Sequence, residues 1–330
     1  MQVNLNTATA GVFSGNLTLT HVSTGEGTTN AADIGVGSSN VTLNGKVYTL
    51  AQATVQSGVN FGIVHVGDVV AARGVSVQNS APVTALNDTL RASISGTGSP
   101  FSNNGGNVAG LTAGGAANTT ALTVGLNTTT AGIFNGNATV ALTSENPDMA
   151  PEALASQNVA LSAQINKYAN AVFDKVTGAG TLSRIGNQFT FDFGTVFQGS
   201  SALSAILDVD NLVGGGPADL LDGSLNLVDG NDFTTLLAGI FSDVAADQSS
   251  GNLLALNFQT NNLGLFTDDI DLSWFGHNAS GYTEANNPFR YSLRVRGTVV
   301  EQNNNVPEPS SWLLFGIALA GLGVSRRRRS

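Results

Sequence analysis

The sequence predicts an all-β protein, built from tandem β-sandwich repeats followed by a short C-terminal transmembrane helix. Three observations predict this fold class. Apolar and polar residues alternate along many short segments, similar stretches recur at long intervals, and an apolar run followed by arginines closes the chain. Alternation with a period of two is typical of strands that bury one face, and the Gly, Asn and Ser residues between the segments indicate turns.

The alternating segments are spread over the whole body of the chain. The clearest are 17–19, 75–77, 90–94, 122–126, 138–142, 159–165, 189–193, 254–258, 270–274 and 293–295. Some seven or eight short strands in roughly 120 residues fit an immunoglobulin-like sandwich. A β-helix would repeat with a much shorter period.

Internal repeats predict how the body is divided. The stretch Leu5–Phe13 recurs as Leu126–Phe134 and, more weakly, as Phe258–Phe266, while a Phe-Gly element at Phe61 recurs at Phe193. The predicted divisions are a truncated half of a first sandwich at 1–57, a second sandwich at 58–175, a third, divergent sandwich at 176–302, and a tail at 303–330.

The first unit begins at its own middle, and the first residues show no signal peptide. We therefore expect the true start to lie upstream, together with a signal peptide that is missing here. The alternative is a genuine degenerate half-domain.

The composition of the chain restricts the kinds of molecule that the protein could bind. Only 11% of the residues are charged, against an average of about 25%. Removing the four tail arginines from the 13 basic residues leaves nine against 23 acidic ones, a net charge of about −14 for the body. Such an acidic body argues against nucleic acid as a partner. The absence of cysteine excludes disulfides and thiolate chemistry within this chain.

The C-terminal tail has the pattern of a membrane segment with a stop signal. An apolar run spans 312–324, and Arg326, Arg327, Arg328 and Arg329 follow it. Thirteen helical residues rise to roughly 20 Å, so they would cross only a thin or locally thinned bilayer. The arginines resist translocation, which would hold the C-terminus in the cytoplasm and leave the body outside the inner membrane.

Just before this run stand Val306, Pro307, Glu308 and Pro309. The order of this motif, a short apolar helix and an arginine cluster resembles the PEP-CTERM sorting signal of Gram-negative bacteria. The resemblance implies that an exosortase, a membrane transpeptidase of bacteria that make exopolysaccharide, recognises and cleaves the tail. It also implies export, transient anchoring in the inner membrane with a periplasmic body, and final delivery to the cell surface.

The repeats carry a second resemblance. Asn60-Phe61-Gly62, then Val66-Gly67 and Val75–Asn79, are similar to bacterial surface domains of the choice-of-anchor D type. That resemblance implies an immunoglobulin-like fold upstream of a C-terminal anchor, and it implies no activity. An acidic insert around 207–232 departs from the pattern.

Chemistry-bearing motifs are scarce. The three histidines are far apart, no metal-binding histidine motif or nucleophile elbow is present, and we expect neither catalysis nor a cofactor. Acidic loops suit calcium, and the weak calcium candidates are Asp208, Asp210, Asp229 and Asp232. They do not match the twelve-residue calcium loop, so solvated turn aspartates are the alternative interpretation.

Two classes of function follow. The first is a structural protein of the cell surface or extracellular matrix, associated with exopolysaccharide and biofilm. The second is a surface adhesin or carbohydrate-binding module, for which Trp274, Tyr282 and Tyr291 are candidates, although the strand phase of Trp274 favours the core. The isolated Thr-x-Thr pieces do not form the flat array that ice binding requires.

Overall fold

The computed structural model describes residues 2–229, 233–237, 239–251, 253–284 and 291–302. All regular secondary structure in this part of the chain is β-structure, as the sequence predicts. No helix long and apolar enough to cross a membrane occurs among the described residues. The predicted membrane segment 312–324 lies outside them.

The chain divides into two compact units. Unit 1 contains residues 1–168 together with the short segments 215–219 and 278–281, and unit 2 contains the rest. The predicted boundary between residues 175 and 176 falls inside a strand of unit 2, Ala171–Gly178, whereas the compact units part after Tyr168.

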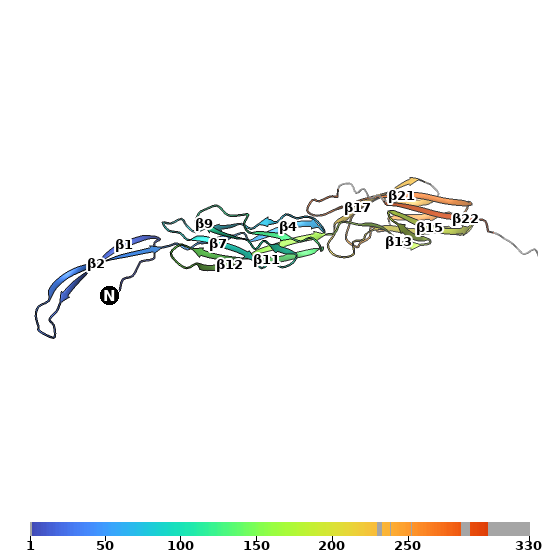
Figure 1. Ribbon diagram of the computed structural model, residues 1–330. Coiled ribbons are helices and arrows are strands. Elements are labelled where there is room, and N and C mark those ends of the chain that lie inside the picture. Colours follow the sequence, from blue (N-terminus) through green and yellow to red (C-terminus); the bar gives the residue numbers. More distant parts are fainter. Residues whose placement is uncertain (1, 230–232, 238, 252, 285–290, 303–330) are drawn as a thin grey trace, which may run out of the picture. The chain divides into compact units, whose positions relative to one another are not determined.

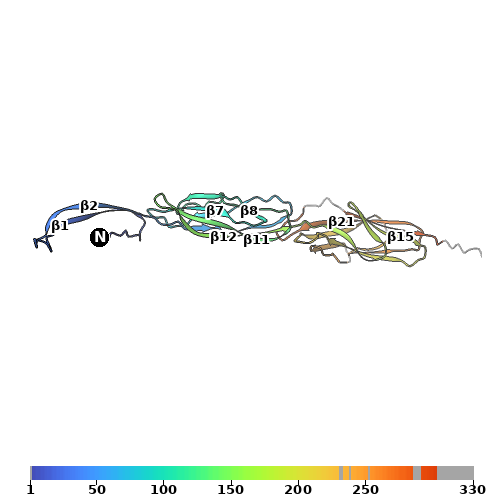
Figure 2. The same ribbon diagram turned by 60° about the horizontal axis from the view of Figure 1, so that its bottom comes forward.

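Unit 1 contains four sheets. The largest has the strand order β4-β12-β11-β7-β9, and the others have the orders β5-β10-β8, β3-β6 and β1-β2. Strands β4, β7, β9, β11 and β12 are labelled together in Figure 1, and Figure 2 labels β7, β8, β11 and β12 of the same unit. The strands are β1 (Gly11–Ser23), β2 (Ile34–Val47), β3 (Ala53–Val55), β4 (Gly58–His65), β5 (Arg73–Gly74), β6 (Val77–Asn79), β7 (Thr89–Ser95), β8 (Phe101–Asn103), β9 (Asn107–Leu111), β10 (Thr123–Leu126), β11 (Gly132–Glu145) and β12 (Glu152–Asn166).

One apolar core holds the sandwich of unit 1 together. The side chains come from the five-stranded sheet and from the strands that face it, including Val77 of β6, Phe101 of β8 and Val124 of β10. The alternating positions predicted for 90–94, 138–142 and 159–165 are buried in this core, which confirms their strand phase. Two sheets that share a core in this way form a β-sandwich.

The described residues of unit 2 form two sheets, with the strand orders β13-β16-β20-β18 and β14-β15-β22-β21-β17-β19. The strands are β13 (Ala171–Gly178), β14 (Thr181–Ile185), β15 (Gln188–Phe197), β16 (Leu203–Asn211), β17 (Leu220–Asp229), β18 (Thr234–Leu237), β19 (Ile240–Val244), β20 (Leu254–Phe258), β21 (Gly264–His277) and β22 (Tyr291–Val300).

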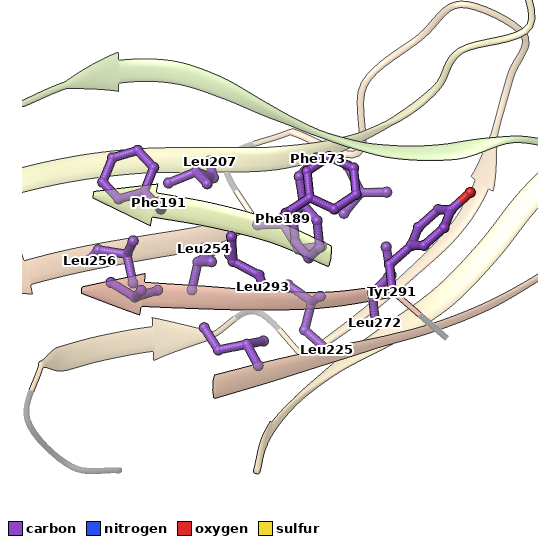
Figure 3. Packing of buried hydrophobic residues seen from close by; sticks show 14 of the residues in the cluster. Phe173, Phe189, Phe191, Leu207, Leu225, Leu254, Leu256, Leu272, Tyr291 and Leu293 are labelled. Carbon is purple, nitrogen blue, oxygen red and sulfur yellow. The ribbon is translucent and has the colours of Figure 1, made fainter. Parts of the chain in front are cut away.

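The core of unit 2 is rich in aromatic side chains. Phe189 of β15 packs against Phe173 of β13, and Figure 3 shows these rings and Phe191 among leucines from both sheets. Phe258 is fully buried and lies 5.4 Å, centroid to centroid, from Phe193. Aromatic side chains bury large areas, so these rings dominate the stability of the sandwich.

The larger sheets of the two sandwiches share an order of five strands, β4-β12-β11-β7-β9 in unit 1 and β15-β22-β21-β17-β19 in unit 2. This shared order explains the Phe-Gly repeat. In each, the strand that carries this element pairs in parallel with the last strand, β4 with β12 and β15 with β22. The glycines Gly62 and Gly194 have φ angles of 76° and 78° and lie where the register of each pair shifts. A positive φ at a bulge favours glycine, so the repeated Gly marks the same bend in both units.

The repeated stretches 5–13, 126–134 and 258–266 each contain the start of a long strand. Gly11, Gly132 and Gly264 begin β1, β11 and β21. Each of these strands pairs with the next long strand, and the register places Gly11 opposite Val47 and Gly132 opposite Ile165. The pairing of β1 with β2 is therefore equivalent to the pairing of the last two long strands in each sandwich, β11 with β12 and β21 with β22. Most side chains of the β1–β2 ribbon are exposed.

Candidate functional site

The sorting residues predicted from the sequence, Val306 to Pro309 and Arg326 to Arg329, lie outside the described residues. Three groups of charged side chains in the described part of the chain are candidates for a site: two groups in unit 2 that could hold a cation, and a buried histidine–aspartate network in unit 1.

The first group is a triad of carboxylates on two neighbouring strands. Asp174 of β13 stands directly opposite Asp208 of β16, and Asp210 lies two residues further along the same strand. Residues two apart in a strand share a face, so all three side chains lie on one side of the strand pair. One carboxylate oxygen from each lies within 4.8 Å of the other two. Phe173 and Val209 alternate with them and enter the core.

Asp208 is the buried member of this triad, with 6% of its surface exposed. The hydroxyl of Ser249 donates a hydrogen bond to its Oδ2, while its buried Oδ1 has no hydrogen-bond partner. Burial, followed by the charges of Asp208 and Asp174, raises the pKa of Asp210 to about 6. The triad therefore holds more negative charge than its surroundings compensate.

The structure separates the four calcium candidates of the sequence. Asp208 and Asp210 lie together in β16, whereas the backbone of Asp229 ends β17 in the other sheet, opposite Asp269. Asp232 lies outside the described residues. Asp174 was missed because it is distant in the sequence and is the only aspartate on its strand. Pairing the strand 171–178 with 203–211 would have found it.

A second group combines one imidazole with two carboxylates. Nε2 of His277 lies 3.3 Å from Oδ1 of Asp222 and 3.3 Å from Oδ1 of Asp243, without the angles of a hydrogen bond. The backbone N–H of Asp243 donates to the same oxygen of Asp222, at 2.7 Å. The imidazole distinguishes this group from the triad, whose three members are all carboxylates.

The third feature is a buried polar network in unit 1. Asp219 is fully buried, and its Oδ2 lies 2.7 Å from Nε2 of His65. Its Oδ1 accepts hydrogen bonds from the amides of Asn166 and Asn278, both at 2.8 Å. The ring of His65 stacks on Tyr168, with the centroids 4.2 Å apart. A buried carboxylate with several donors stabilises a fold, and we assign this network a structural role.

The aromatic candidates for sugar binding divide between core and surface layers. Trp274 and Tyr291 are 9% and 7% exposed and belong to the core of unit 2, which confirms the core phase predicted for Trp274. Tyr282 is partly exposed. A sugar ring stacks on an exposed aromatic face, and neither Trp274 nor Tyr291 offers one.

Comparison with protein families decides the nature of the tail. Residues 305–329 match the PEP-CTERM protein-sorting motif. The motif implies a protein that is exported and sorted by an exosortase. The choice-of-anchor D resemblance of the repeats stays a prediction. No curated protein matches the chain.

Several solved structures are similar to the chain at low sequence identity. Mouse protocadherin-24 EC1-3 has 10% identity and a TM-score of 0.37, with 87% of this chain and 80% of that chain covered. A protein of unknown function from Porphyromonas gingivalis W83 has 13% identity and a TM-score of 0.28, covering 74% and 99%. The CFA/I fimbrial adhesive subunit CfaE of enterotoxigenic Escherichia coli has 8% identity and a TM-score of 0.28, covering 72% and 82%. At TM-scores this low, none of these similarities assigns a function.

Proposed function

We propose that this protein is an exosortase substrate whose tail is cleaved near Glu308 and whose body serves as a structural component of the exopolysaccharide matrix. The single observation that carries the proposal is the match of residues 305–329 to the sorting motif. The signal needs all three of its elements in order, and the chain has the Pro-Glu-Pro motif, the apolar run and the arginines.

The physical chemistry of the tail supports sorting over permanent anchoring. An apolar run of 13 residues spans roughly 20 Å as a helix, which is shorter than the ~30 Å hydrocarbon layer. Arginine side chains can snorkel to the interface and so lengthen the span. Such a segment would pause in the inner membrane, with the Pro-Glu-Pro motif on the same side as the body.

The body supports a structural role without catalysis. The larger sheets of its two sandwiches share an order of five strands, and only 11% of the residues are charged. His65 is buried in the network with Asp219, and His277 faces two carboxylates. His21 contacts Ser39 on the exposed β1–β2 ribbon, where water has free access. The low fraction of charged residues, in a chain rich in Asn, Thr and Ser, suits a hydrated polysaccharide matrix.

Intact mass measurement and C-terminal peptide mapping test the proposed cleavage. The full chain would be expressed behind a functional export signal, in isogenic strains with and without the cognate exosortase. We expect loss of the segment that follows the 306–309 region only where exosortase is present. Replacing Glu308 by Gln should leave the tail intact, whereas Glu301→Gln, outside the motif, should be processed as in the wild type.

Fractionation of the same cultures tests the proposed destination. The processed body should appear with the exopolysaccharide at the surface, and the Glu308→Gln variant should remain with the inner membrane. An intact tail in both strains would refute cleavage. Processed protein that appears only in the medium, without polysaccharide, would refute the role in the matrix.

A further inference from the structure

The carboxylate triad of unit 2 brings together three oxygen atoms that are suitable ligands for a cation. We propose that Asp174, Asp208 and Asp210 bind one calcium ion, which stabilises the sandwich of unit 2 once the protein is outside the cell. The proposal does not depend on how the tail is processed.

The argument begins with uncompensated charge. Three carboxylate oxygens lie within 4.8 Å of one another, with Asp208 buried, Asp210 half-buried and Asp174 exposed. Like charges at this distance repel, and the repulsion is strongest at the buried Asp208, where water screens it least. None of the three residues forms an ion pair with a lysine, arginine or histidine of the described chain. The nearest lysine in sequence, Lys175, donates its Nζ to the backbone oxygen of Gly180 instead. A bound cation would supply the missing positive charge.

A second observation is the unpartnered oxygen of Asp208. Its Oδ1 is buried and accepts no hydrogen bond, although the residue is only 6% exposed. An orphaned buried carboxylate oxygen is costly and calls for a partner. Ser249 fixes the other oxygen, and the backbone N–H of Gly251 in turn donates to the Ser249 hydroxyl at 3.0 Å. The buried carboxylate is thus held in place with one oxygen left for a ligand.

The other sandwich shows that the fold does not require these carboxylates. Asn79 of β6 and Asn211 of β16 are equivalent, because each is buried and takes a backbone N–H on its Oδ1. The register agrees, with Ala53 opposite Asn79 and Ala171 opposite Asn211.

Counting along the paired strands from these asparagines, the three aspartates correspond to Gln56, Ser76 and Gln78 of unit 1. These side chains are neutral, and the two glutamines form hydrogen bonds: Oε1 of Gln56 accepts from the backbone N–H of Ser76, and Gln78 donates to the backbone oxygen of Gly115. The same strand pair therefore forms without charge. Only unit 2 has acidic residues at these positions. Since the fold does not need them, their presence is expected if they bind a ligand.

The donor set selects the ion. All the side-chain ligands are oxygens, which favours a hard cation over zinc or copper. Calcium takes six to eight oxygens at about 2.3–2.6 Å in flexible geometry, so its ligand oxygens lie at most about 5 Å apart. The spacing in the triad falls within that limit. Magnesium demands a stricter octahedron at shorter distances. Carboxylates that bind in a bidentate manner, together with water, would complete the coordination of calcium.

Calorimetry and melting of the full chain test the site. Calcium chloride would be titrated into protein treated with EDTA, and thermal unfolding of unit 2 would be followed by the fluorescence of the buried Trp274. We expect one ion per chain, with an affinity in the range of about 0.1–1 mM that extracellular modules show. At 10 mM calcium the melting temperature should rise by about 5 °C.

The decisive variant replaces the three aspartates by the residues at the corresponding positions of unit 1, as Asp174→Gln, Asp208→Ser and Asp210→Gln together. It should lose the calcium response and, in EDTA, melt above the wild type, because the repulsion is gone. If this variant fails to fold, the single change Asp210→Gln at the half-buried position decides instead, with an expected tenfold loss of affinity. Asp243→Asn, in the other charged group of unit 2, is the matched control and should bind calcium normally.

Three results would overturn the proposal. The first is the absence of both binding heat and a melting shift in the wild type. The second is unchanged calcium affinity in the variant with the unit 1 residues. The third is loss of binding in Asp243→Asn, which would place the ion at the group formed with Asp222 and His277.

Discussion

Removing the buried carboxylate of Asp219 should destabilise unit 1 strongly and leave unit 2 nearly unchanged. The change is Asp219→Ala. It deletes the acceptor for His65, Asn166 and Asn278, whose donor atoms lie 2.7 to 2.8 Å from the carboxylate. His65 and Asn166 are 5% and 1% exposed, so water does not reach them easily.

The magnitude follows from these contacts. Each buried donor left without a partner costs about 1–3 kcal/mol, and the change removes the acceptor of three donors. A water molecule entering the space left by the carboxylate would restore some of the hydrogen bonds. We therefore expect a loss of about 3–5 kcal/mol in the free energy of unfolding of unit 1.

Asp219→Asn is the matched variant. Its amide oxygen can still accept from Asn166 and Asn278, and its NH₂ can donate to Nε2 of His65 if the imidazole proton moves to Nδ1. That proton would then face Oδ2 of Asp68, which lies 3.6 Å from Nδ1. The network stays nearly satisfied, so we expect a loss of only about 1 kcal/mol.

Hydrogen exchange of the full chain, read by mass spectrometry, separates the two units. In Asp219→Ala the amides of β4 and β12 should exchange at least about a hundredfold faster, as a loss of 3 kcal/mol implies, while those of β20 and β22 keep their protection. Exchange in β4 and β12 that changes less than about threefold would refute the reasoning. Equal acceleration in β20 and β22 would also refute it.

Three further predictions concern the cores and the triad. Gly297→Ala should destabilise unit 2 by about 1–3 kcal/mol in denaturant unfolding, because the new Cβ would stand 2.6 Å from the ring of Phe258; a melt like that of the wild type would show that the ring can move. Asn79→Ala should cost unit 1 about 2–4 kcal/mol by hydrogen exchange, since its Nδ2 donates to two backbone oxygens and its Oδ1 accepts two backbone N–H groups; unchanged protection of β7 would contradict this. Without calcium, the protonation of Asp210 should contribute about 1 kcal/mol to the stability of unit 2 as the pH falls from 7 to 4, after allowance for solvent screening of this half-buried residue. The pKa of Asp210 is raised to about 6 in the fold from a usual 3.8, beside Asp208 and Asp174, so the penalty is fully present above pH 6 and disappears below 3.8. The Asp210→Gln variant should lack this gain, and equal pH profiles of the two proteins would disprove the assignment.

Much of the fold could be predicted because the evidence was local or repeated. The alternating segments at 138–142 and 159–165 are strands with the predicted faces buried, since a strand that packs on one side must alternate. The repeated glycines Gly62 and Gly194 have the same bend because only glycine takes a positive φ without strain. The first strand of each sandwich was harder to assign. Its short segments, 53–55 and 171–178, carry no repeated motif, so their unit is known only from the strands with which they pair.

Only part of the candidate site could be predicted from the sequence. Asp208 and Asp210 are separated by one residue, so their shared face follows from strand geometry alone. Asp174 joins them only because β13 pairs with β16 in one particular register. The contact of His65 with Asp219 is of the same kind, since it links positions far apart in the chain.

By itself, the sequence determined that this chain is made of strands, where its repeats lie, and that it ends in a sorting motif, because each of these is written in neighbouring residues. Only the tertiary structure decided which aspartates meet and which remain alone. A carboxylate acquires its environment from pairing across a sheet and from burial, and neither of these can be read along a single strand.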